Sequence, residues 1–216
     1  MTPERKARIE QVAAVRQRDL TVFLERVHKA HNVAAILRTC DAVGMMEAHA
    51  VPPTGGIPKL NHTAQGAQRW VKLHRHHDAV EGLRSLRQKG FSLYAAHFSE
   101  QAVDFRQPDY THPTAIVLGT EKFGVSDEAV AECDGEIVIP MAGMSQSLNV
   151  SVATALILYE AQRQRLAAGM YEPQSLAEEP WKSLSEQWIE RETVRRSKGR
   201  GIRSPTTKSG DEDCST

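Results

Sequence analysis

The sequence is poor in cysteine. Its 216 residues include three cysteines, Cys40, Cys133 and Cys214, with no CxxC spacing and no group of histidines at ligand spacing. An odd number of scattered thiols argues against a disulfide framework and against a structural zinc site. The sequence therefore predicts a protein of a reducing compartment that binds no metal.

The chain also lacks long apolar runs and an excess of either charge. No stretch approaches the length of a membrane span, and the N-terminal segment is charged where a signal peptide would be apolar. We therefore expect a cytoplasmic protein without a membrane partner. The 27 basic and 27 acidic side chains cancel, so composition alone indicates no polyanionic partner, but residues 1–30 carry a basic excess and residues 191–208 are strongly basic.

The length and a hydrophobic fraction of 40% suit one compact domain with extensions. Thr2 can cap a helix that starts at Pro3, which predicts an N-terminal basic helical arm over residues 1–19. The main domain is predicted over residues 20–170. Residues 171–216 are predicted to form a C-terminal extension, weakly helical over 181–194 and ending in a disordered basic tail.

Short apolar runs alternate with helical patterns in the main domain. Strands are predicted at 20–27, 48–51, 91–96, 115–118 and 137–139, with helices at 33–43, 78–89 and 127–133. This alternation predicts an α/β fold whose mostly parallel sheet is flanked by helices on both faces. A long helix is predicted over 148–166, and because residues 150–159 are apolar on every side, more than one sheet face must cover them. We therefore expect a homodimer.

Three polar segments lie between a predicted strand and the helix that follows it. Because the carboxyl ends of parallel strands lie at the same edge of a sheet, we expect the three segments to form one pocket. In the first, Asn32 is predicted to be a helix N-cap, and Arg38 lies opposite the apolar stripe of the helix. Taken alone, this segment is more typical of an ordinary helix with an asparagine cap and a solvated arginine than of a functional site.

The second segment, 118–124, carries Gly119, Thr120, Glu121 and Gly124 after an apolar strand. The glycines suggest a phosphate loop, but no Lys-Ser/Thr follows them, and Glu121 could equally be an acid at a helix start. The third segment, 139–149, ends in Ser147, Leu148 and Asn149. Ser147 alone would be an N-cap, whereas the Asn149 amide precedes an apolar helix and needs a polar partner.

Together the three segments resemble the three motifs of the SpoU branch of the SPOUT RNA methyltransferases, over about residues 20–171. The resemblance implies a C-terminal trefoil knot and S-adenosyl-L-methionine as cofactor. It implies catalytic roles for Arg38, Asn32, Glu121, Ser147 and Asn149, and a cofactor site formed by Gly119, Thr120, Glu121, Ile139, Met144, Ser147 and Leu148. Ala30 stands where the family usually has proline, a change that removes no reactive group.

Within this branch the chain is most similar to tRNA guanosine-2'-O-methyltransferases, so the expected product is 2'-O-methylguanosine at position 18 in the D-loop of tRNA. One alternative is a ribosomal RNA ribose 2'-O-methyltransferase, although many of these carry an additional N-terminal RNA-binding domain. The other is a non-catalytic RNA-binding protein on the same fold, which the presence of all five catalytic residue types disfavours.

Arg38 is a poor general base because a guanidinium stays protonated. We expect it to fix a phosphate and stabilise the developing alkoxide while phosphate or water takes the proton, and the family proposal of a deprotonated arginine stays open. The tRNA itself should be recognised outside the pocket. The residues predicted to contact RNA, each of which could instead be an ordinary surface residue, are Arg8, Arg16, His31, Arg163 and Arg165.

Overall fold

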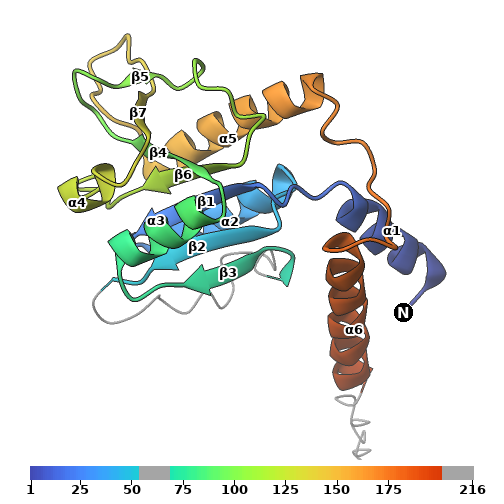
Figure 1. The fold of residues 1–216 in the computed structure, drawn as a ribbon. Coiled ribbons are helices and arrows are strands. Elements are labelled where there is room, and N and C mark those ends of the chain that lie inside the picture. The colour runs from blue at the N-terminus through green and yellow to red at the C-terminus, as the bar shows by residue number, and fades with distance from the viewer. Residues whose placement is uncertain (54–68, 201–216) are drawn as a thin grey trace, which may run out of the picture.

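A parallel sheet forms the centre of the protein (Figure 1). The computed structural model describes residues 1–53 and 69–200, and within them every strand pairing is parallel. In sheet order the strands are β3 (Lys72–Arg75), β2 (Glu47–Val51), β1 (Leu20–Glu25), β6 (Thr114–Leu118), β4 (Ser92–Ala96), β7 (Gly135–Val138) and β5 (Val103–Asp104). The central strands β1 and β6 are buried at every residue, as expected for near-continuous apolar runs covered on both faces.

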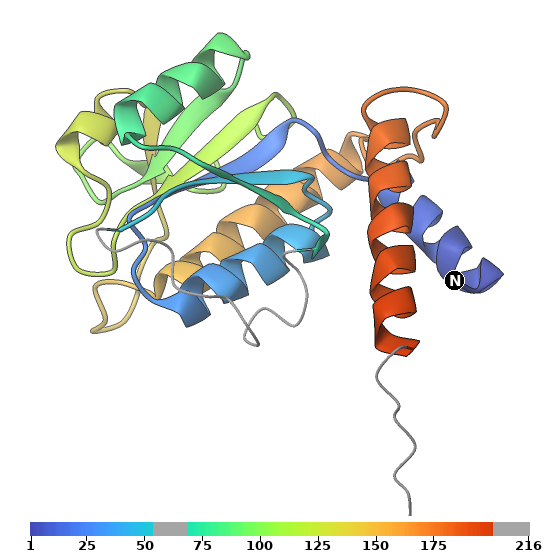
Figure 2. The ribbon, with the colours of Figure 1, turned by 90° about the horizontal axis from the view of Figure 1, so that it is seen from below.

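Helices cover both faces of the sheet (Figure 2). One face carries α2 (Ala30–Ala42) and α5 (Val150–Ala167), and the other carries α3 (Ala79–Gln88) and α4 (Asp127–Val130). Alternate residues of β1 serve the two layers, since Val22 packs with the first pair of helices and Phe23 with the second. The predicted α/β class, with a parallel sheet between helical layers, is confirmed.

The first and last helices form a separate unit beside the sheet. There α1 (Pro3–Ala14) packs against α6 (Trp181–Arg200) through Ile9, Ala13 and Trp188 (Figures 1 and 2). Thr2 caps α1 as predicted, and the Trp181 indole N–H donates to the Arg16 carbonyl at 3.0 Å. The basic arm and the C-terminal extension, predicted as separate segments, thus meet in one α1–α6 unit. The predicted disordered tail beyond residue 200 lies outside the described residues.

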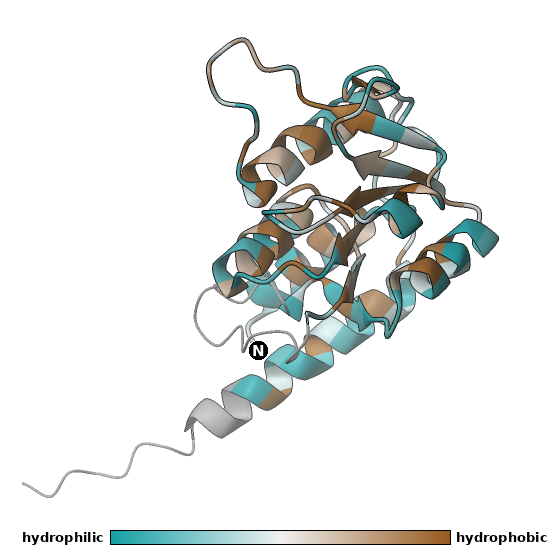
Figure 3. Cartoon of the chain, turned by 90° about the vertical axis from the view of Figure 1, so that its left-hand side faces the viewer, coloured by the Kyte–Doolittle hydropathy of each residue, from teal (hydrophilic) through white to brown (hydrophobic). Residues whose placement is uncertain are grey.

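The predicted strands and helices of the main domain are present, with ends shifted by up to three residues. The sequence patterns missed β3 and β5, because β3 is mostly polar and β5 has two residues, so neither offers an apolar run. They also underestimated α6. It extends to Arg200, and Figure 3 shows it as a largely hydrophilic helix beside a core of apolar strands. In the described part of the chain no helix is long and apolar enough to cross a membrane.

Helix α5 is covered on one side only. Ile157, Leu158 and Ala161 are buried in the core cluster shared with α2, whereas Val152, Leu156 and Tyr159 are 48%, 43% and 53% exposed. The last three side chains follow one another at helical spacing and form an exposed apolar stripe. In a single protomer this face of α5 therefore stays uncovered, and it is the face that the sequence predicted to be covered by a second subunit.

Candidate active site

The structure brings together one polar side chain from each of the three motifs. Asn32 Nδ2 donates to Glu121 Oε1 at 2.6 Å, and Asn149 Nδ2 donates to Asn32 Oδ1 at 3.2 Å. Asn32 lies in the first turn of α2 after β1, Glu121 follows β6, and Asn149 immediately precedes α5. These three residues, which we call the motif cluster, meet at the carboxyl ends of parallel strands as expected.

The prediction that Asn32 is the N-cap of its helix is wrong. Helix α2 begins at Ala30, after Lys29, so Asn32 lies inside the first turn. Its side chain is buried, and both ends of its amide are used, one by Glu121 and the other by Asn149. A buried amide must be hydrogen-bonded, and because these two partners occupy both of its ends, the side chain does not cap the helix.

Glu121 lies in the 119–124 loop, six residues before α4, so the interpretation of Glu121 as a helix-start acid is wrong. Partial burial alone would raise the pKa of Glu121, but hydrogen bonds from its own backbone amide and from Asn32, with the nearby Lys29 charge, hold that pKa below its ordinary value. The cluster therefore holds a carboxylate in its charged form at neutral pH.

The Asn149 side chain has two tasks. Its Oδ1 accepts from the Ser151 N–H at 2.8 Å and caps α5, while its Nδ2 donates to Asn32. The expectation that this amide needs a polar partner is confirmed. The alternative in which Ser147 caps the helix is wrong, because α5 begins only after Asn149.

The loop after β6 closes on itself. The Thr120 N–H donates to the Gly124 carbonyl at 2.9 Å, and the Gly124 N–H donates back at 3.0 Å. The Phe123 N–H donates to Thr120 Oγ1 at 3.0 Å, so three backbone amides are used inside the loop and are not offered to a phosphate. A Cβ at Gly119 would lie 1.8 Å from the Gly124 carbonyl oxygen, so this closure, which presents Glu121 to Asn32, requires glycine there.

The other residues predicted to bind the cofactor lie in the segment from β7 to α5. Ile139 packs partly against the core, whereas Met144, Ser147 and Leu148 are exposed. Among the described residues Ser147 makes no hydrogen bond, so the structure does not join it to the motif cluster. Its exposed position leaves it available to a ligand.

Arg38 is exposed on α2, opposite the buried stripe, as the helical pattern predicted. It is six residues from Asn32, or about 9 Å along the helix axis, and does not join the motif cluster. Within the described residues its side chain makes no hydrogen bond or ion pair. Its guanidinium is therefore available to a phosphate.

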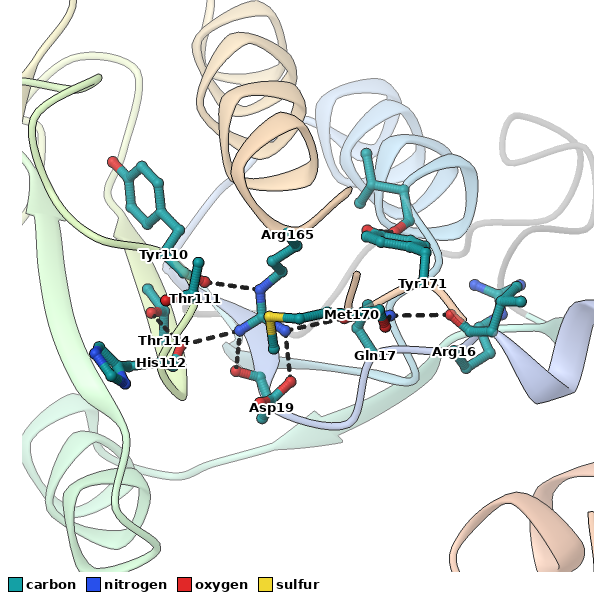
Figure 4. Close-up of polar contacts among 12 residues, drawn as sticks. Arg16, Gln17, Asp19, Tyr110, Thr111, His112, Thr114, Arg165, Met170 and Tyr171 are labelled. Atoms are coloured by element: carbon teal, nitrogen blue, oxygen red, sulfur yellow. Dashed lines mark hydrogen bonds and ion pairs between the residues drawn. The ribbon is translucent and has the colours of Figure 1, made fainter. Parts of the chain in front are cut away.

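The predicted RNA contacts divide into exposed and buried side chains. Arg8, His31 and Arg163 are exposed, and Arg163 pairs with Glu160 at 2.8 Å. Arg165 is 0% exposed, and its guanidinium donates to Gln17, Asp19 and the carbonyls of residues 19, 110 and 112 (Figure 4).

Arg16 is likewise 2% exposed, bound to the Asp41 carboxylate and to the Met45 carbonyl at 2.9 Å. The RNA-contact prediction is inconsistent with the structure for Arg16 and Arg165, because arginines with these partners tie distant segments of the fold together.

The sequence patterns missed a concave region at the α1–α6 unit, lined by arginines around Trp70 and Trp188. Basic residues interleaved with tryptophan are the signal that could have found it. Across residues 1–53 and 69–200, no group of three or more histidine, cysteine or acidic side chains is placed to hold a metal ion.

Comparison with known proteins shows that the chain is similar to RNA-modifying enzymes. The model of the SpoU rRNA Methylase family matches residues 19–159. A tRNA (guanosine(18)-2'-O)-methyltransferase of Thermus thermophilus is 56% identical over 188 residues, 87% of this chain and 97% of the relative. The solved A. aeolicus TrmH/SpoU tRNA modifying enzyme is 44% identical, with a TM-score of 0.82 over 88% of this chain and 96% of that one.

A more distant structure is of the SpoU methyltransferase AviRb from Streptomyces viridochromogenes in complex with AdoMet. It is 27% identical, with a TM-score of 0.63, and the match covers 70% of this chain and 60% of that one.

Proposed function

Because this chain belongs to the SpoU rRNA methylase family, we propose that it transfers a methyl group from S-adenosylmethionine to the ribose 2'-oxygen of guanosine 18 in tRNA. The observation that carries the proposal is the motif cluster, in which Asn32, Glu121 and Asn149 converge from three strand ends. The tRNA substrate is supported by the Thermus thermophilus enzyme, which matches over nearly its whole length. A reaction on tRNA also agrees with the cytoplasmic location expected from the sequence.

The cofactor would be held by the loop 119–124 and the segment 139–149, which follow β6 and β7. S-adenosylmethionine supplies an electrophilic methyl group on a positively charged sulfur. The charged Glu121 carboxylate of the 119–124 loop suits a cationic ligand, and the partly covered Ile139 and the exposed Leu148 offer apolar contact. Ser147 is exposed and free to hydrogen-bond the cofactor or the ribose.

Arg38 prepares the acceptor. Its exposed guanidinium binds a phosphate of the RNA beside the target ribose, which fixes the 2'-oxygen in place. The same positive charge stabilises the alkoxide as its proton leaves to phosphate or water. The alternative is that a deprotonated Arg38 acts as the base. It requires the guanidinium to lose a proton that it ordinarily keeps.

Methylation of tRNA is expected to depend on guanosine at position 18. Incubation with labelled donor, nuclease digestion and mass spectrometry should show methylated ribose at that position and no product from a matched tRNA with adenosine there. Methyl transfer to fragments of ribosomal RNA but not to tRNA would favour the ribosomal alternative. Binding of tRNA with no methylated product would favour the non-catalytic alternative.

The protein is expected to be a homodimer that covers the exposed apolar stripe of α5. Sedimentation at micromolar concentration should give twice the 24.0 kDa of one chain. Leu156→Glu, in the stripe, should shift the population toward monomer, whereas Val194→Glu on α6 should not. A parent protein that sediments near 24.0 kDa would refute the prediction.

The trefoil knot implied by the resemblance belongs to the same proposal. The support for it is the family match, together with the path of the chain from β7, through the segment 139–149, to α5, which packs back against α2. An experimental structure with cofactor bound would test whether the chain is threaded.

A further inference from the structure

Glu25, the last residue of β1, is a buried acid at the carboxyl edge of the sheet. It is 4% exposed, and among the described residues no basic side chain forms an ion pair with it. A buried carboxylate is costly unless its oxygens are hydrogen-bonded. Oε2 accepts from the Ser126 N–H at 2.9 Å, and Oε1 accepts from the Ser126 hydroxyl at 2.7 Å. Both oxygens therefore bind one residue that lies 101 positions further along the chain.

Ser126 ends the segment that carries Glu121. The chain leaves β6 at Gly119, closes the 119–124 loop, and re-enters the core at Val125, which is 2% exposed. Ser126 follows and caps α4, where its Oγ accepts from the Ala129 N–H at 3.3 Å. The pairing of β6 with β1 fixes one end of this segment, and the contacts of Val125 and Ser126 fix the other.

Two side-chain links join the same pair of segments. Glu25 binds Ser126, and Asn32 binds Glu121 at 2.6 Å. The links are seven residues apart in the segment that connects β1 to α2, and five residues apart in the segment that connects β6 to α4. A loop held at one point can pivot about it, whereas two separate links also fix its orientation. The Glu25 link therefore determines how Glu121 faces Asn32.

The backbone of Glu25 is itself firmly held. Glu25 pairs with Val51 of β2, and the next N–H, that of Arg26, donates to the Val51 carbonyl at 3.0 Å. Arg26 has a φ of 52° and is the one non-glycine of the described residues in the left-handed region, which disfavours an arginine. The chain thus turns directly after Glu25. This turn leaves the carboxylate on the paired strand and carries Asn32 onto α2.

We propose that Glu25 is a positioning residue for methyl transfer, which anchors the 119–126 segment through Ser126 so that Glu121 meets Asn32 and the cofactor. The proposal rests on the proposed function for the identity of the reaction. Because Glu25 is buried and bound to Ser126, it acts through Glu121 and touches neither cofactor nor RNA.

The first test compares two substitutions of Glu25. Leucine fills a similar volume but accepts no hydrogen bond, so in Glu25→Leu kcat should fall on the order of tenfold and S-adenosylmethionine should bind more weakly. The KM for tRNA should stay close to the parent value, because Arg38 on α2 is outside the anchored segment. Glu25→Gln should restore most of the activity, since its amide oxygen can accept from the Ser126 N–H and its NH₂ can donate to the Ser126 hydroxyl.

A matched control removes a nearby acid that has no anchoring role. Glu128 on α4 is exposed, and in the described part of the chain its side chain makes no hydrogen bond or ion pair. Glu128→Leu should keep the parent kcat. If Glu25→Leu loses activity only in proportion to its unfolded fraction, Glu25 supports the fold alone and the proposal is wrong. Equal losses of kcat in Glu25→Leu and Glu25→Gln would assign the effect to charge and would also overturn it.

A double-variant cycle tests whether Glu25 acts through Glu121. Removal of the Glu121 carboxylate in Glu121→Ala leaves nothing for the anchor to position, so adding Glu25→Leu should lower kcat little further. Multiplied losses in the double variant would show that the two residues act independently, contrary to the proposal.

A titration of the protein without RNA or cofactor separates this inference from the proposed function. Partial burial raises the pKa of Glu121, but hydrogen bonds from its own backbone amide and from Asn32 hold that pKa below its ordinary value. Carbon-13 NMR of the Glu121 carboxyl should show a higher pKa in Glu25→Leu, because the charged form loses the Asn32 donor, and a parent-like pKa in Glu25→Gln. This shift in a protein that methylates no tRNA would confirm the anchoring while the proposed function fails. An unchanged titration in Glu25→Leu would overturn the anchoring, whatever the activity.

Discussion

Replacing Arg165 with methionine is expected to lower the free energy of unfolding by about 3–5 kcal/mol, the usual cost of removing one partner of a buried ion pair. The five bonds of this guanidinium join the end of α5 to the start of β1 and to the loop before β6 (Figure 4). Methionine fills a similar volume but donates nothing. The Asp19 carboxylate, the Gln17 side-chain oxygen and the Tyr110 carbonyl would then lose this donor, whereas the carbonyls of residues 19 and 112 would keep their bonds from Thr114.

Urea unfolding measures this loss. The protein concentration should be the same for all variants, because the apparent stability of a dimer would depend on it. Arg163→Met is the matched control, since Arg163 lies on the same helix but is exposed and pairs only with Glu160 at the surface. It should change the midpoint little. Arg165→Lys should fall between the parent and Arg165→Met, because three donors cannot replace five. If Arg165→Met unfolds like the parent but loses tRNA affinity, the RNA-contact prediction was right.

The burial of Arg165 and Arg16 illustrates what could not be predicted from the sequence. Both lie in segments rich in charge, where a solvated side chain is the ordinary expectation. Their acceptors are supplied by residues such as Asp19 and Asp41, which are 146 and 25 positions away. No local pattern contains such partners. The packing of α1 on α6 depends on the same kind of long-range contact.

The features set by local pattern were predictable. The apolar stripe of α2 placed Arg38 on the exposed side, and the alternation of strands and helices gave the parallel sheet. The motif cluster follows from that topology, because Asn32, Glu121 and Asn149 each follow or precede an element whose position was foreseen. Which atoms pair was not foreseen. The Asn32 side chain bonds to the Glu121 carboxylate and does not cap the helix, and this outcome depends on where the two residues lie in the folded protein.

Replacing Arg38 with alanine is expected to slow methyl transfer by on the order of a hundredfold or more, as for other deleted groups that stabilise developing charge. Arg38 makes no bond to the described residues and faces away from the core, so its removal should leave no cavity and no unpaired acid. A loss of activity therefore cannot be assigned to unfolding. Arg38→Lys should recover little, because an ammonium cannot grip a phosphate through two parallel bonds.

Single-turnover rates at saturating tRNA, with calorimetry for S-adenosylmethionine, separate the steps. Arg84→Ala is the control, an exposed helical arginine on the opposite face of the sheet that pairs with Glu132. It should methylate at the parent rate. If phosphate or water takes the proton, the pH dependence of the rate should have the same shape in Arg38→Ala as in the parent. If Arg38 were the general base, its ionisation would appear in the profile of the parent and be lost from that of the variant, which would be flatter. If the Arg38→Ala rate stays within a few-fold of the parent while cofactor binding collapses, Arg38 serves the methyl donor and not the ribose.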